Sequence, residues 1–339
     1  MIHKLYAIAI VFNGLFLISQ VSVAESSQPE WVEGGAKLYP AQLYITATGT
    51  APDVELAKNR ALANLSKVFE SHIRATSTTQ NNVEVVMEQG EKQYSRRQSI
   101  AQQIQLRTDK IINGVRIAET WQDKSVSIFH ALAVLNRTQA SNNIYQEMQQ
   151  LDYETQVALE QSQLLSDSLR SISALNQSIV YQSKRRALHK MLKVVDIQGK
   201  GYPSKWSIRE LEAQLEAKLF TLGVAAAVDN DPVGALEETL RSAMGNAGFP
   251  ADKENPAYTL VVNLDVQDLG FRQGWYWLRA KLAIKVISSD GRVRGRKQWP
   301  LKVSALHRMD TEGRLMTQVD ETLNAELKQA ILQIATAEE

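Results

Sequence analysis

Apolar and polar positions follow two periods along this chain, and these periods predict its strands and helices. Residues 43–49 alternate apolar and small polar side chains, which is typical of a half-buried strand, and Gly49 is expected to end it. A helix is predicted next, because apolar residues recur every three or four positions: Val54, Ala57, Ala61, Leu65, Val68 and Phe69. Since several of these are alanine, we expect the helix to approach its sheet closely.

The next stretch predicts a weak strand, a helix and a hairpin. Residues 76–99 are polar with little periodicity, which suggests a weak strand and an exposed excursion before a helix around residues 99–110. Residues 114–121 and 125–135 predict two paired strands, joined at residues 122–124. One face of the second strand is expected to hold Val126, Ile128, His130, Leu132 and Val134.

A long helical region follows. Residues 141–195 keep helical spacing of apolar residues, and residues 115–198 contain neither glycine nor proline. One helix of this length would extend about 80 Å, which exceeds the width of a small domain. A break near residues 152–155 or near residues 181–183, giving an antiparallel hairpin or a projecting stalk, is an equally good prediction.

Residues after 200 predict a second α+β unit. Residues 208–219 form an amphipathic helix, and another contains Leu236 and Leu240, with Asp231-Pro232 at its start. Apolar and polar residues then alternate in residues 258–266, 278–286 and 299–305, which predicts three strands. This pattern favours an antiparallel sheet with one solvent-exposed face. A final helix, with apolar residues from Leu315 to Ile334, would cover the dry face.

The predicted fold class is therefore α+β, in four segments. Residues 1–24 are a signal peptide, and residues 25–140 an N-terminal α/β sandwich domain. Residues 141–198 are a long helical connector, and residues 199–339 a C-terminal antiparallel sheet covered by helices.

Residues 1–24 have the pattern of a cleavable export signal. Lys4 precedes an apolar run from Leu5 to Ile18, and small residues lie before Glu25 at Ser22-Val23-Ala24. The run is shorter than the ~20 residues that span a bilayer, so cleavage is favoured over a retained anchor. This predicts a periplasmic protein, and loss of Lys4 would reduce the formal charge from +1 to zero. With a net charge of zero, the protein would have no overall electrostatic attraction for nucleic acid.

Several residue patterns in the first unit resemble the LPP-20 type of envelope lipoprotein domain. They are Pro29-Glu30-Trp31, the strand ending at Gly49, the alanine-rich segment 57–63 and the run Ile-Phe-His-Ala-Leu-Ala-Val-Leu-Asn-Arg at 128–137. The resemblance covers residues 29–140. It implies a non-enzymatic bacterial envelope protein, and several members are linked to flagellar assembly or to outer-membrane rings. Lipoprotein members have a cysteine directly after the signal, whereas this chain has Ala24-Glu25 and no cysteine, which excludes lipid on cysteine.

The sequence shows no pattern typical of an active site. His72, His130, His189 and His307 are scattered, so we predict no metal site, and His130 is interpreted as an interior histidine rather than a pH switch. Serine elbows, glycine-rich phosphate loops and cysteines are absent. We therefore predict no enzyme activity, no catalytic residues and no cofactor.

Two segments are candidate interaction surfaces. In residues 270–277, alternation places Trp275 and Trp277 on the face of Arg279, with Tyr276 between them; the alternative is that these rings cap the sheet's own core. The second segment is a basic arm with Arg292, Arg294 and Arg296, for which the alternative is a solubilising edge strand.

These observations together predict a non-catalytic scaffold or assembly protein of the cell envelope. We expect it in the periplasm, associated with the outer membrane and with flagellar assembly, with envelope or flagellar assembly proteins as partners and no nucleic acid. The alternative function is a binder of a lipid or peptidoglycan fragment in a cleft between the two domains.

Overall fold

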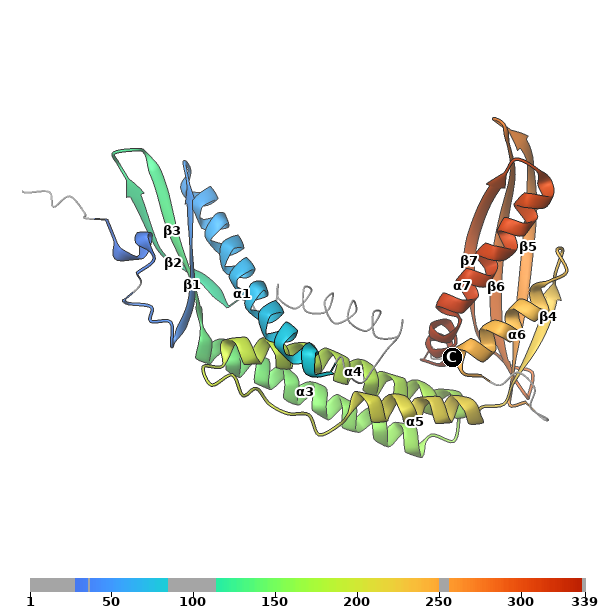
Figure 1. Cartoon of the computed structure of the whole chain (residues 1–339). Helices are drawn as coiled ribbons and strands as arrows, with labels where there is room; N and C mark the ends of the chain where they lie inside the picture. Colours follow the sequence, from blue (N-terminus) through green and yellow to red (C-terminus); the bar gives the residue numbers. More distant parts are fainter. Residues whose placement is uncertain (1–27, 36, 85–113, 250–255, 337–339) are drawn as a thin grey trace, which may run out of the picture.

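A layer of helices joins two separate α/β units (Figure 1). The computed structural model describes residues 28–35, 37–84, 114–249 and 256–336. The predicted signal peptide, the excursion beyond residue 84 and the helix at 99–110 lie outside the described residues. The two units contain a three-stranded and a four-stranded sheet, each covered by helices, so the predicted α+β class is confirmed.

The N-terminal unit is an antiparallel sheet covered by one helix. Its strands are β1 (Tyr44–Ala51), β2 (Val115–Asp123) and β3 (Ile128–Asn136), in the order β1-β3-β2, and its helix is α1 (Val54–Glu84). The predicted hairpin is confirmed, although its turn lies at residues 124–127, so that Val126 is in the turn. The prediction of a weak strand is wrong for residues 76–84, because α1 continues to Glu84 and no glycine or proline interrupts it. The rest of that stretch lies outside the described residues.

Gly49 lies where β1 and α1 meet most closely. A Cβ atom at Gly49 would lie 2.2 Å from the amide nitrogen of Ala61 and 2.3 Å from the carbonyl oxygen of Ala57. Both alanines are fully buried, and the predicted close approach of helix and sheet is confirmed. The prediction that Gly49 ends the strand is wrong, because β1 continues through Ala51. A strand tolerates glycine where another backbone approaches this closely.

The connector is an antiparallel helical hairpin. Its helices are α3 (Arg137–Leu164) and α4 (Ser168–Val195). Both predicted break positions are wrong, since the chain turns at residues 165–167. The side chain of Asp167 accepts a hydrogen bond from the amide of Arg170, 2.9 Å away, and so caps the start of α4.

A buried polar network fixes the two helices of the hairpin against the chain that follows them. Arg185 in α4 is only 2% exposed, and its Nε lies 2.6 Å from a carboxylate oxygen of Asp152 in α3. Its terminal nitrogens donate to the carbonyl oxygens of Tyr202, at 3.3 Å, and Pro203, at 3.0 Å. Because a buried guanidinium needs such partners, this network links α3, α4 and the loop that follows α4.

The C-terminal unit is a four-stranded sheet with the order β4-β5-β6-β7. Its strands are β4 (Val224–Asn230), β5 (Tyr258–Arg272), β6 (Trp275–Ser288) and β7 (Val293–Ala305). Its helices are α6 (Leu236–Ala247) and α7 (Arg308–Thr336), and α5 (Ile208–Thr221) packs beside α4 in the helical layer (Figure 1). Strand β4 was not predicted from the sequence, because its small side chains show no clear alternation of apolar and polar residues. Because β4 runs parallel to β5, the sheet is mixed rather than purely antiparallel.

The loop before α6 differs in detail from the prediction. The helix begins at Leu236 and not at Asp231-Pro232. Both carboxylate oxygens of Asp231 accept backbone amides, including that of Leu236 at 2.8 Å. Asp231 therefore organises a turn that leads into the helix.

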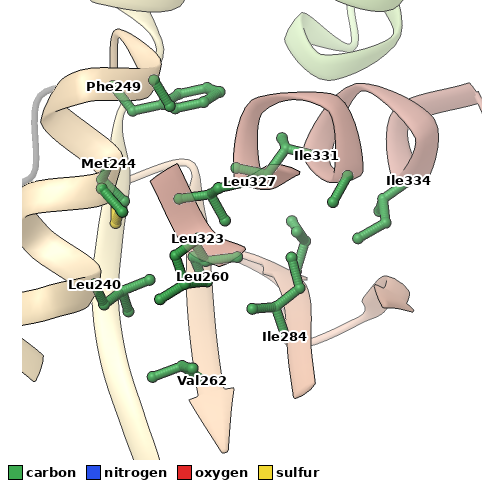
Figure 2. Packing of buried hydrophobic residues seen from close by; sticks show 14 of the residues in the cluster. Leu240, Met244, Phe249, Leu260, Val262, Ile284, Leu323, Leu327, Ile331 and Ile334 are labelled. Atoms are coloured by element: carbon green, nitrogen blue, oxygen red, sulfur yellow. The ribbon is translucent and has the colours of Figure 1, made fainter. Parts of the chain in front are cut away.

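Helix α4 contributes to the cores of both units. Its first half, with Leu169, Ile172 and Leu175, belongs to the core formed by α5, α6, α7 and the four-stranded sheet. Figure 2 shows the centre of that core, where side chains from α6, α7, β5 and β6 meet. The second half of α4, with Leu188 and Met191, packs with α1, α3 and the three-stranded sheet. One continuous helix thus connects two hydrophobic cores.

Candidate interaction surface

The candidate surface is the face of the C-terminal sheet that α6 and α7 leave uncovered. Along β6, the even-numbered residues from Leu278 to Val286 are buried against the helices. The odd-numbered residues lie on the opposite face, because side chains alternate along a strand. This second face carries Trp275, Trp277, Arg279, Lys281 and Lys285.

The two tryptophans lie on this outer face. The side chain of Trp275 is 40% exposed. Trp277 is half-buried, its indole nitrogen lies 3.4 Å from the carbonyl oxygen of Arg272, and the ammonium of Lys302 lies 4.6 Å from its ring centroid. The alternative interpretation required these two rings to cap the core, but they lie on the opposite face of the sheet.

Tyr276 points to the opposite side. Its ring is half-buried against the core, and its hydroxyl donates a hydrogen bond to Asp268. That hydrogen bond raises the pKa of Tyr276 and lowers the pKa of Asp268. Tyr276 therefore supports the hairpin and is not part of the outer face.

Five cations form what we call the cationic face: Arg279, Lys281, Lys285, Arg296 and Lys302. Strands β6 and β7 contain no acidic residue. The strand register places Arg279 directly opposite Lys302, and Lys285 directly opposite Arg296. Like charges in these positions repel and destabilise a sheet.

Acidic residues lie beside only part of the cationic face, since Asp265 on β5 is opposite Lys281 in the strand register and Asp229 on β4 is near Lys285. Lys285 lies 3.5 Å from a carboxylate oxygen of Asp229 on β4. Within the described chain, Arg279, Lys281 and Arg296 have no ion pair. Cations on the edge strand β7 can be explained as protection against the addition of another strand. This explanation does not apply to the three cations on β6, because β6 is an interior strand.

The basic arm predicted from the sequence is divided among three environments. Arg292 forms an ion pair with Asp290 within its own turn, and Arg294 forms one with Asp167 at 2.5 Å. Only Arg296 joins the cationic face. The physical reason is a bulge, because Val286 pairs with Gly295 while Ile287 pairs with Val293, which takes Arg294 out of the alternation.

Asp167 holds the C-terminal sheet to the helical layer. Burial would raise the pKa of Asp167, but hydrogen bonds from the amide of Arg170 and from Arg294 outweigh it and lower that pKa. The hydroxyl of Tyr258 on β5 also donates to Asp167, over 3.2 Å. Arg294 is therefore a structural residue and not part of an exposed patch.

The histidines of the described residues form no metal-binding cluster. His130 is half-buried on β3, where its Nδ1 lies 3.2 Å from the hydroxyl of Thr50 and its ring lies 5.4 Å from that of Trp121. Among the described residues, no group of three or more His, Asp or Glu side chains is placed to hold a metal ion.

Residues that carry the family resemblance have clear structural roles in the first unit. Trp31 is buried against Leu132, and its indole nitrogen donates to Glu119 over 2.7 Å. Asn136 caps α3 by accepting the amide of Gln139, and Arg137 donates to the carbonyl oxygens of Ala41 and Val194, both at 2.8 Å. This arrangement ties β3, the first loop and the end of α4 together.

Residues 29–136 match the LPP20 lipoprotein family. The predicted resemblance of the N-terminal region is thereby confirmed, and the LPP20 match supports a protein of the cell envelope with lipoprotein-like features. No curated protein matches the chain. None of the described helices combines the length and apolarity that crossing a membrane requires.

Solved structures with some similarity include secreted proteins and lipoproteins. The secreted protein HP1454 from Helicobacter pylori is 15% identical, with a TM-score of 0.43, over 87% of this chain and 99% of that one. A putative lipoprotein from Caulobacter crescentus is 14% identical, with a TM-score of 0.26, over 36% of this chain and 92% of that one. A minor lipoprotein from Acinetobacter baumannii is 17% identical, with a TM-score of 0.25, over 34% and 96% respectively.

Trp275, Trp277 and Arg279, which alternation predicted on one face, lie on the same face of β6. The opposition of Arg279 to Lys302 and of Lys285 to Arg296 was not predicted, because the register between strands is not visible in either strand alone. The absence of acidic residues from both strands was the available signal.

Proposed function

We propose that this protein is a non-catalytic scaffold or assembly component that works in the periplasm, at the outer membrane. The observation that carries the proposal is the cationic face, where cations of the interior strand β6 lie opposite cations of β7. Of these cations, Lys285 also lies near Asp229, whereas Arg279 and Arg296 form no ion pair within the described residues. Such an arrangement costs folding stability, and a binding partner of opposite charge would offset that cost.

The helical layer supports the scaffold role. Since α4 shares side chains with both cores, it connects the LPP20 domain and the cationic face through packed structure rather than a flexible linker. A partner bound at the cationic face would thus be held at a set distance from the LPP20 domain. Flagellar assembly proteins of the envelope, to which the family resemblance points, are the first partners to test.

The test is site-specific photo-crosslinking in the host cell. A photoreactive residue at position 281, on the cationic face, should form a discrete crosslink to an envelope protein, whereas one at the exposed Gly313 in α7 should not. The double variant Trp275→Ala/Trp277→Ala should lose this crosslink. Its melting temperature should fall by less than about 4 °C, because both rings lie on the outer face.

Two results would contradict this proposal. One is a double variant that keeps the crosslink yet unfolds at a much lower temperature, which would make the tryptophans structural. The other is a turnover activity of the purified protein that one side-chain replacement abolishes.

A further inference from the structure

We propose that the cationic face binds an extended, acidic segment of a partner protein. This inference rests on the proposed function and names the chemistry of the partner. It follows from the spacing of the cations, the width of the cationic face and the position of the tryptophans.

The spacing of the cations matches that of an extended polypeptide. Arg279, Lys281 and Lys285 are separated by even numbers of residues along β6 and therefore point the same way. At about 3.4 Å per residue, neighbouring positions on this face are ~7 Å apart, and the row is ~20 Å long. Acidic side chains at alternate positions of an extended segment have the same ~7 Å spacing, so one segment of about seven residues would match the row.

The cationic face is narrow. Its five cations lie on the adjacent strands β6 and β7, which in a sheet are about 5 Å apart. On the neighbouring strands the outer face carries acids: Asp265 on β5 lies opposite Lys281, and Asp229 on β4 lies beside Lys285. A planar anionic membrane would approach these carboxylates as well as the cations. A linear anionic chain between β6 and β7 would lie closer to Arg279, Arg296 and Lys302 than to these carboxylates, because β7 is on the side of β6 away from β5 and β4.

The tryptophans provide an apolar contact at one end of the cationic row. Trp275 is exposed next to the turn, and Trp277 precedes Arg279 on the same face. Exposed indole rings beside cations are typical of protein interfaces, where the ring contributes buried area. The segment that fits therefore has an acidic, alternating stretch with an apolar residue at one end.

The test measures binding of a labelled peptide to the protein purified from its host. The probe is a fluorescein-labelled peptide of four Asp-Thr repeats followed by Leu, and the control probe has Asn in place of Asp. Fluorescence anisotropy should show binding of the Asp peptide alone, weakening as salt rises from 50 to 300 mM. The double variant Arg279→Thr/Arg296→Thr should bind about tenfold more weakly or worse, since two charge contacts are lost.

The control variant is Lys124→Gln/Arg209→Gln, which removes two exposed cations outside the cationic face. It should bind the Asp peptide as the unmodified protein does. The melting temperature separates binding from folding: the face variant should melt at the same temperature or higher, because each substitution removes one member of an opposed cation pair.

Three outcomes would overturn the inference. The Asn peptide could bind equally well, or both double variants could lose binding equally. Alternatively, vesicles of phosphatidylglycerol could bind through Arg279 and Arg296 while the Asp peptide does not, which would identify a membrane surface instead. If the Asp peptide fails but the crosslink from position 281 still depends on Trp275 and Trp277, the proposed function stands and only this partner chemistry is wrong.

Discussion

At the scale of single residues, small changes in side-chain volume decide whether the elements can pack. Gly49 allows the backbone of β1 to lie against the backbone of α1, and Ala57 and Ala61 provide the small surface on the helix side. The neighbouring groups are backbone atoms, which cannot rotate away as a side chain can. The alanine-rich pattern was visible in the sequence, but the role of Gly49 was not, because it depends on the distance between two elements.

Replacing Gly49 with alanine should destabilise the protein. The added Cβ would lie 2.2 Å from a backbone nitrogen, so helix and sheet must separate, and we expect a loss of about 3 kcal/mol in the free energy of unfolding. Chemical denaturation measures this loss. The matched control is Gly313→Ala in the exposed part of α7, where the added Cβ would have nothing within 4 Å except its own residue, the adjacent residues and the backbone of α7. That change should stabilise by about 0.5 to 1 kcal/mol through helix propensity.

At the scale of elements, the prediction succeeded where a pattern is local and failed where a tertiary contact ends or bends an element. The hairpin β2–β3 and the strands β5, β6 and β7 alternate clearly and were predicted. The turn between α3 and α4 was placed wrongly. Asp167 in that turn caps α4 and also pairs with Arg294 from β7, a contact between segments distant in sequence. The bulge at Arg294 likewise appears only when β7 is paired with β6.

The loop at residues 199–203 contacts α4 through His189. Nδ1 of His189 lies 3.2 Å from the amide nitrogen and 2.7 Å from the carbonyl oxygen of Tyr202. Burial lowers the pKa of His189 below its ordinary value of 6.5, and Lys193, Arg185 and Arg186 lower it further, against the carbonyl of Tyr202, which raises it. The folded protein therefore favours the neutral ring.

Acidification should weaken the fold through His189. Because its folded pKa lies below its unfolded pKa, the unfolded state takes up the proton first as the pH falls. The stabilisation is complete above about pH 6.5 and is lost as the pH falls through the lower, folded pKa. The melting temperature should therefore drop between pH 7.5 and pH 5.5, and His189→Gln should reduce the drop. The control variant His307→Gln, at an exposed histidine, should retain the full drop in melting temperature. Equal drops in the unmodified protein and in both variants would show that His189 is not responsible.

At the scale of the whole molecule, α4 belongs to both units, and we therefore expect the two units to unfold cooperatively. Its two halves lie in different hydrophobic cores, and no break in the helix separates them. Loss of either core would therefore remove half of the packing that holds α4. Residues 141–198 were predicted to be a helical connector between domains, whereas the buried apolar residues of α4 are divided between the two cores.

A cavity in one core should weaken both units. Leu188→Ala in the core with α1 and Leu175→Ala in the core with α7 should each lower the free energy of unfolding by about 2 to 5 kcal/mol. Hydrogen exchange followed by mass spectrometry should show faster exchange in β5 and β6 even for Leu188→Ala. Leu164→Ala, at a side chain 84% exposed, serves as a control without effect. Unchanged exchange in β5 and β6 of the Leu188→Ala variant would mean that the units unfold independently.

The sequence by itself determined the class of the fold, the LPP20 resemblance, the helical connector and the buried face of the strands β5, β6 and β7. These features follow from periods of two and 3.6 residues, which are local properties of the chain. Only the tertiary structure decided that β4 joins the sheet in parallel, that α4 belongs to two cores, that Arg294 turns inward to Asp167, and that cations oppose one another across β6 and β7. Each of these depends on the pairing of segments distant in sequence, and strand register and helix packing are set by that pairing.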